Sequence, residues 1–292
     1  MNIFKVILSG SQCNKNRLNI PGFLLSGLVL LIVGSTAISC DNNSASEAAD
    51  PADKTLMAIF AHPDDETLVG PILHKYANLG SEVILVTATD GRLGFNDLHD
   101  YNEEELAAVR QDELRCAADM LGVELIHLDY KDQLGMSEGH GSLISQSRGI
   151  LEDLHRIIEE RQPDAIITFG PDGFSNHIDH RIVGISATQV VLSREWEKTP
   201  ALFYSAVPSS VLSEEEKIYM GVHDRYLTVQ MTFSDEELET AKQAALCHES
   251  QFSPEFVDTW FETMQERGNT LHFRPFEAPG NQANDLFEYP AR

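Results

Sequence analysis

Cysteine is scarce in this chain, with four among 292 residues. Cys13 and Cys40 lie in an N-terminal leader, which leaves Cys116 and Cys247 for the rest of the chain. So few cysteines exclude a fold that depends on many disulfides. Both remaining cysteines lie in helix-like, apolar stretches. We therefore expect two buried free thiols rather than a disulfide, although an exported location would allow one.

Basic side chains are also scarce. The chain has 21 lysines and arginines against 46 aspartates and glutamates, a formal net charge of −25. Lys5, Lys15 and Arg17 place three positive charges in a leader without acids, so the rest of the chain lies near −28, three units below the −25 of the whole. So acidic a surface argues against nucleic acid and anionic lipid headgroups as partners, because it repels both. It does not bear on uncharged sugars.

The apolar run at residues 23–38 is short for a membrane-spanning helix, which needs ~20 apolar residues. It follows a basic segment and ends in small residues, which is the order of a secretory signal. Cys40, at the end of "STAISC", resembles the cysteine of a bacterial lipoprotein box. We therefore predict a leader at residues 1–40, lipidation of Cys40, and an exported lipoprotein anchored to a membrane of the cell envelope. A retained membrane helix is the alternative.

The remaining chain divides into a tether and one domain. Residues 41–53, "DNNSASEAADPAD", are small and polar without periodicity, as in a flexible linker. Residues 54–292 suffice for one α/β domain with a full core. From Pro208 onward the pattern is less regular, which predicts a C-terminal extension of the same domain.

Strand-like and helix-like segments alternate along this domain. Apolar, β-branched strands are predicted at the following residues: 54–60, 82–89, 123–128, 163–169 and 201–207. The pattern predicts a Rossmann-like α/β fold, a mostly parallel sheet with helices on both faces. Ligands bind such sheets beyond the C-terminal ends of the strands. The loops that follow the first four strands therefore meet at one rim, where we expect the active site.

Two of these loops are rich in histidine and aspartate. "AHPDDE", residues 61–66, follows the first strand, and "GPDGFSNHIDH", residues 170–180, follows the fourth. Taken alone, the acids of the first loop are explained by helix capping. Together, the two loops bring imidazoles and carboxylates to one rim, and these are the usual ligands of a catalytic zinc that keeps an open position for water.

On these motifs the sequence resembles the PIG-L/LmbE-like de-N-acetylases. Three further stretches are similar to that family: "TATDGRLG", "RQDELRCAADMLGV" and "AKQAALCHESQ". The likeness covers residues from about Lys54 to Gln251. It implies a zinc-dependent hydrolase that removes the acetyl group from an N-acetylglucosamine-type substrate, giving acetate and a free amine.

The resemblance also assigns roles to individual residues. It implies one divalent metal, zinc in the first place, with three ligands: His62, Asp65 and His180. Asp64 matches the general base, and His177 matches the histidine that stabilises the oxyanion and can protonate the leaving amine. Asp179 is expected to orient one of the histidines. Arg110 and Asp132 occupy positions at which some relatives hold the sugar.

The sequence leaves alternatives open. Some relatives carry a tyrosine two residues before the oxyanion histidine, and here that position is Ser175. A zinc amidase that cleaves another amide is one alternative function, and a non-catalytic glycan-binding module at the cell surface is another. Asp64 argues against the binding module, because a module without catalysis needs no general base beside its metal ligands. No mechanistic role is assigned to His248.

Overall fold

The computed structural model describes residues 50–94 and 99–276. The predicted leader with Cys40, most of the predicted tether and the last sixteen residues therefore lie outside the described residues. Within the described ranges, no helix is both long enough and apolar enough to cross a membrane.

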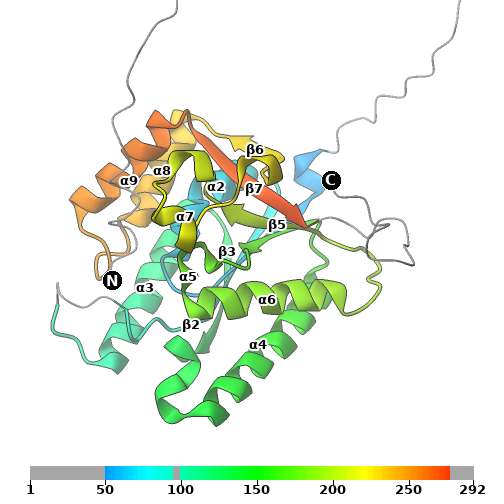
Figure 1. The fold of residues 1–292 in the computed structure, drawn as a ribbon, viewed down its shortest axis with the longest axis vertical. Coiled ribbons are helices and arrows are strands. Elements are labelled where there is room, and N and C mark those ends of the chain that lie inside the picture. Colours follow the sequence, from blue (N-terminus) through cyan, green and yellow to red (C-terminus); the bar gives the residue numbers. More distant parts are fainter. Residues whose placement is uncertain (1–49, 95–98, 277–292) are drawn as a thin grey trace, which may run out of the picture. The chain divides into compact units, whose positions relative to one another are not determined.

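In the described part of the chain, seven strands form one sheet in the order β3-β2-β1-β4-β5-β7-β6 (Figure 1). Five of them pair in parallel: β1 (Thr55–Phe60), β2 (Glu82–Thr89), β3 (Glu124–Tyr130), β4 (Ala165–Phe169) and β5 (Ala201–Ala206). The chain runs outward from β1 to β3 and then returns to place β4 on the other side of β1. The predicted mostly parallel sheet is confirmed, and its strand order reverses between β1 and β4.

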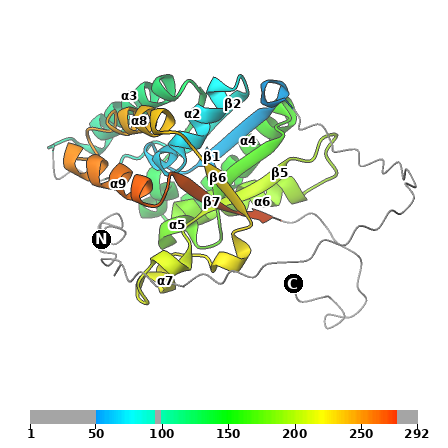
Figure 2. The ribbon, with the colours of Figure 1, turned by 90° about the horizontal axis from the view of Figure 1, so that it is seen from above.

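Helices cover both faces of the sheet (Figures 1 and 2). One face carries α2 (Gly70–Asn78) and α3 (Glu103–Leu121), with α8 (Asp235–Ala245) packed on both and α9 (Pro254–Glu266) beside α8. The other face carries α4 (His140–Arg161) and α6 (Ile178–Leu192), which pack against each other. The remaining helical turns are short: η1 (Pro51–Asp53), η2 (Asp65–Leu68), η3 (Asp132–Glu138), α5 (Gly173–Asn176), η4 (Ser209–Val211), α7 (Glu216–Tyr219) and η5 (Asp224–Tyr226).

Local signals explain the bounds of α3. Asn102 accepts a hydrogen bond from the backbone N–H of Glu105, whose side chain accepts from the N–H of Asn102 in return. This capping box satisfies two backbone N–H groups that the first turn leaves without a helical partner. At the other end, Gly122 adopts the left-handed conformation that stops the helix (φ 73°).

The C-terminal extension adds two antiparallel strands to the sheet. The first of them along the chain is β6, which spans Val229–Thr232. Between β5 and β6 lies β7 (Thr270–Phe276), which the sequence analysis did not identify. The extension thus belongs to the same sheet as the parallel strands, and it shields the edge of β5.

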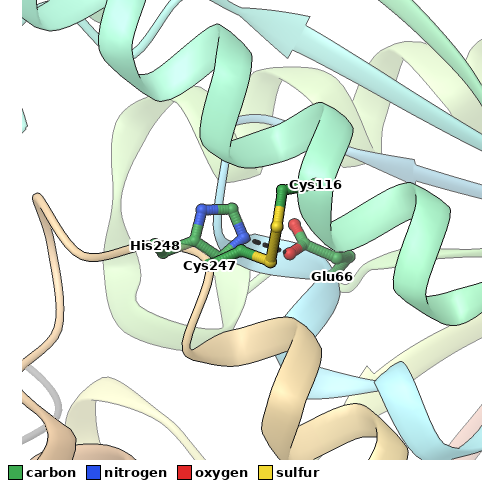
Figure 3. Close-up of a disulfide and its surroundings, with 4 residues drawn as sticks. All are labelled: Glu66, Cys116, Cys247 and His248. Atoms are coloured by element: carbon green, nitrogen blue, oxygen red, sulfur yellow. Dashed lines mark hydrogen bonds and ion pairs between the residues drawn. A yellow bond between two sulfur atoms is a disulfide. The ribbon is translucent and has the colours of Figure 1, made fainter.

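The two cysteines of the domain form a disulfide, so the expectation of two buried free thiols was wrong (Figure 3). Cys116 lies on α3 and is exposed, whereas Cys247 lies two residues after the end of α8 and is half-buried. Their Cα atoms are 5.9 Å apart, although 131 positions separate them in the sequence. The pairing depends on the packing of α8 against α3, which neither local stretch encodes.

The disulfide should stabilise the fold. A cross-link that closes so long a loop restricts the unfolded chain, so replacing both cysteines by serine should lower the free energy of unfolding by about 2–4 kcal/mol. Urea unfolding of the two proteins measures the difference. Reductant should bring the wild type toward the double variant and leave the double variant unchanged. A wild-type midpoint that does not respond to reductant would contradict the cross-link.

Candidate active site

The candidate site lies where the strand order reverses. A cavity of about 170 Å³ opens there between the loops that follow β1 and β4. Its walls also include residues from the β2 and β3 loops and from the segment after α8. The lining residues are His62, Asp64, Asp65, Leu68, Leu93, Gly94, Arg110, Asp132, Gln133, Phe174, Ser175, His177, His180 and Gln251. Each of the four loops that were predicted to meet at one rim therefore contributes residues to this cavity.

The structure brings together the three predicted metal ligands. His62 Nδ1 lies 3.0 Å from His180 Nε2. Asp65 Oδ1 lies 3.2 Å from His180 Nε2, and Asp65 Oδ2 lies 3.5 Å from His62 Nδ1. All three residues are buried. The backbone N–H groups of Ala61 and His62 also donate to Asp65 Oδ2, which fixes this carboxylate to the turn after β1.

Hydrogen bonds on the far sides of the two rings decide which nitrogens carry hydrogen. His180 Nδ1 lies 2.9 Å from the carbonyl oxygen of Gly173, so it donates. His62 Nε2 lies 3.2 Å from Asp179 Oδ2 and 3.3 Å from Asp132 Oδ1, and it donates to these carboxylates. In the neutral rings, His62 Nδ1 and His180 Nε2 therefore present lone pairs to each other and to Asp65.

Such a cluster of acceptors fits a cation. Two lone pairs 3.0 Å apart beside a carboxylate repel unless a positive charge lies among them. Tetrahedral zinc with bonds of about 2.0–2.1 Å to nitrogen and oxygen separates its ligands by about 3.3 Å. The observed separations of 3.0–3.5 Å match that spacing. The donor set of two imidazoles and one carboxylate is also one that catalytic zinc uses.

Two other groups of side chains in the described ranges could hold an ion, and both include His62. One group consists of His62, Asp132 and Asp179. It would bind the ion through His62 Nε2, which donates to these two carboxylates, so Nε2 would first have to lose its hydrogen. A group of His62, His177 and His180 would replace Asp65 by a third histidine. His177 already uses one ring nitrogen to accept from the backbone N–H of Asp179, at 3.3 Å. We therefore favour the group that includes Asp65.

Asp64 lines the same cavity as the three candidate ligands, but its carboxylate pairs with Arg110. Its backbone φ of 127° is rare for a residue other than glycine and costs about 1–3 kcal/mol. In this conformation Asp64 Oδ2 accepts from the Arg110 guanidinium at 2.8 Å, while the next residue, Asp65, faces the histidines. Burial raises the pKa of Asp64 to about 6, although Arg110 opposes the rise. A carboxylate with such a pKa suits general-base chemistry near neutral pH.

His177 is half-buried at the wall of the cavity. Since its Nδ1 accepts from the backbone N–H of Asp179, the hydrogen of the neutral ring resides on Nε2. Burial and, in the same direction, the nearby rings of His62 and His180 lower the pKa of His177 to about 4. His177 is therefore a neutral hydrogen-bond donor at pH 7.

The three remaining predicted residues are buried around these groups. Asp179 lies directly behind His62, where it was expected to orient a histidine, and also accepts from the N–H of Gln133 at 2.7 Å. Asp132 accepts from the N–H of Leu93 at 3.0 Å and lies close to His62. Arg110 donates to the carbonyl oxygens of Pro63 and Gly91 as well as to Asp64. Arg110 and Asp132 both line the cavity, and their contact with a sugar stays a prediction.

The structure adds residues that the sequence analysis missed. Gln133 and Phe174 line the cavity in left-handed backbone conformations, with φ of 53° and 58°. Neither is glycine or asparagine, so no local signal marked these turns. Glu66 and His248 form a buried contact just behind the first loop. The sequence assigns no individual role to Glu66 or to His248.

Comparison with known proteins agrees with this architecture. Residues 57–191 match the PIG-L family, described as GlcNAc-PI de-N-acetylase. The 1D-myo-inositol 2-acetamido-2-deoxy-alpha-D-glucopyranoside deacetylase of Corynebacterium diphtheriae is 35% identical over 140 residues, which cover 42% of this chain and 47% of the relative. The chain thus spans about half the length of the first curated relatives it matches.

Solved structures show the same fold at low identity. The N,N'-diacetylchitobiose deacetylase of Pyrococcus horikoshii superposes with a TM-score of 0.55 at 24% identity, over 76% of this chain and 84% of that one. The 4-carboxy-2-hydroxymuconate hydratase GalB of Pseudomonas putida superposes with a TM-score of 0.59 at 12% identity, over 80% of this chain and all of that one, 100%. The fold therefore does not determine the reaction. The PIG-L match covers residues 57–191 and includes both histidine-bearing loops.

Proposed function

We propose that this protein is a metal-dependent hydrolase that removes the acetyl group from an N-acetylglucosamine-type amino sugar. The observation that carries the proposal is the division of roles between two adjacent aspartates, Asp65 among the candidate ligands and Asp64 beside Arg110. The relatives support the substrate class, because their names describe deacetylation of a 2-acetamido sugar and of diacetylchitobiose.

His62, Asp65 and His180 would hold the metal, and zinc is an ion that two imidazoles and one carboxylate bind in catalytic sites. When bound there, zinc supplies Lewis acidity for the activation of water and the polarisation of the amide carbonyl. Asp179 and Asp132 support His62 from behind, and the carbonyl of Gly173 supports His180. Such outer contacts keep the coordinating nitrogens free of hydrogen and correctly aimed.

Asp64 is the general base in this proposal. Arg110 holds one carboxylate oxygen, Oδ2, which fixes the side chain and leaves Oδ1 to accept a proton from the attacking water. An amide is a weak electrophile, so removal of this proton as water attacks lowers the barrier of the first step. The proton then stays on Asp64 until the C–N bond breaks.

His177 stabilises the negative charge that develops on the amide oxygen. Its Nε2–H is a donor in a neutral ring, held in orientation by the N–H of Asp179. Donors fixed in advance in a site that excludes water stabilise an oxyanion more than they stabilise the neutral carbonyl. Because His177 is neutral at pH 7, the protonated Asp64 delivers the proton to the leaving nitrogen. The products are acetate and a free amine.

We also propose that the protein is exported and anchored through lipid on Cys40. The order of charges and apolar residues in the leader supports this location. The disulfide between Cys116 and Cys247 supports it independently, because disulfides persist in the oxidising cell envelope and are rare in the cytosol, where thiols are kept reduced.

Loss of either candidate histidine ligand should remove the metal. Purified His62→Ala and His180→Ala should each contain far less zinc than the wild type, because two ligands do not retain an ion that needs three. His177→Ala is the matched control and should keep its zinc, since we place His177 outside the ligand set. Elemental analysis of the three variants decides the set. Loss of zinc from His177→Ala would favour the three-histidine group instead.

Asp64→Asn should separate chemistry from metal binding. The amide keeps the size of the side chain but cannot take a proton from water, so acetate release should fall by about 10²–10⁴-fold with zinc content unchanged. The assay is acetate release from a panel of N-acetylated amino sugars, with the exposed Asp112→Asn as control. A wild type that binds these sugars without releasing acetate would contradict the enzyme, and an Asp64→Asn variant as fast as the wild type would contradict the base.

Cys40→Ser should move the protein from the membrane fraction to the soluble fraction. The serine cannot carry the thioether-linked lipid, and the acidic domain has no other proposed attachment to anionic membranes. Fractionation of cells that express each form, with a radiolabelled fatty acid as tracer, measures both location and lipidation. Unchanged membrane partition without label on Cys40 would favour the retained helix.

A further inference from the structure

A second pair of ionisable side chains lies buried behind the site. His248 Nε2 contacts Glu66 Oε1 (Figure 3), although the two residues are 182 positions apart. Glu66 is 1% exposed and His248 is fully buried. Neither lines the cavity, so the proposed reaction does not use them directly. Burying a carboxylate and an imidazole is costly, which calls for an explanation of what the pair holds in place.

Glu66 connects this pair to the proposed base. Its other carboxylate oxygen, Oε2, accepts from the backbone N–H of Asp64 at 3.1 Å. The carbonyl on the opposite side of the same peptide bond, that of Pro63, accepts from Arg110. Both polar groups of the peptide between Pro63 and Asp64 are therefore held, one by Glu66 and the other by Arg110. This arrangement fixes the peptide plane immediately before the rare φ of 127° at Asp64.

Helix α3 carries Arg110 and also holds the segment that contains His248. Arg110, Glu113 and Cys116 lie on successive turns of this helix. Glu113 accepts from the N–H and the hydroxyl of Ser250, each at 2.7 Å, and Cys116 forms the disulfide with Cys247. The segment that carries His248 is thus tied to the helix that carries Arg110.

We propose that Glu66 and His248 are positioning residues for the general base, a role that rests on the function proposed above. His248 orients the carboxylate of Glu66, and Glu66 holds the backbone of Asp64 in the conformation that separates its side chain from that of Asp65. Neither residue of the pair lines the cavity. The pair acts on the rate through Asp64 alone.

This role predicts a specific kinetic pattern. His248→Leu removes the hydrogen bond to Glu66, lets Asp64 shift, and should lower kcat by about 10–100-fold, since displacement of a catalytic group by 1 Å can cost about 10²-fold. KM and zinc content should stay near the wild-type values. His248→Gln keeps an N–H donor at a similar distance and should recover most of the rate. Glu66→Met and Glu66→Gln form an equivalent pair of variants at the other end of the contact.

The decisive experiment places His248→Leu in the Asp64→Asn background. If His248 acts only through Asp64, the double variant should release acetate as slowly as Asp64→Asn alone, because two residues on one path are not additive. Zinc content and Tm are measured on each protein. Should His248→Leu fail to fold, the Glu66→Met variant takes its place in the cycle.

Each outcome distinguishes the inference from the proposed function. A wild type that releases no acetate from any substrate of the panel overturns the proposed function, and the positioning role with it. A wild type that is active while His248→Leu and Glu66→Met keep its kcat overturns the positioning role alone. If the rate losses of His248→Leu and Asp64→Asn multiply in the double variant, the pair does not act through the base. Loss of zinc in the single variants would show that the pair supports the metal site instead.

Discussion

The site depends on one electrostatic constraint. His62 Nδ1, His180 Nε2 and the carboxylate of Asp65 converge within 3.0–3.5 Å as acceptors, with no hydrogen of their own to share. With both rings neutral, a bound cation stabilises such an arrangement. The fold produces it because β1 and β4 are neighbours at the reversal of the strand order, so the loops that follow them meet. Asp179 and Gly173 then set the hydrogen positions of the two rings from outside.

The neighbouring aspartate has a different role because its carboxylate has a different partner. Asp64 has a positive φ and its carboxylate pairs with Arg110, whereas the carboxylate of Asp65 lies beside the candidate ligands His62 and His180. Helix α3 maintains this arrangement. Its Arg110 binds the side chain of Asp64, while Glu113 and Cys116 bind the segment whose His248 contacts Glu66. Through Arg110, helix α3 thus helps to fix the proposed base relative to the candidate metal ligands.

Much of this could be read from the sequence because the signals are local. The alternation of apolar strands and capped helices predicted the parallel sheet, and the two histidine-bearing loops at strand ends predicted the site. The failures concern contacts between distant segments. The disulfide joins residues 131 positions apart, and β7 is recognised only by its pairing with β5 and β6. The left-handed turn at Gln133 breaks the local preferences that sequence reasoning uses.

Diffraction from zinc-loaded crystals at the zinc absorption edge tests the central claim most directly. The anomalous signal locates the ion without reference to activity. The account predicts one peak bonded to His62 Nδ1, His180 Nε2 and a carboxylate oxygen of Asp65, with the carboxylate of Asp64 outside bonding distance and still paired with Arg110. A peak among His62, Asp132 and Asp179, or one bonded to His177 or Asp64, would contradict it.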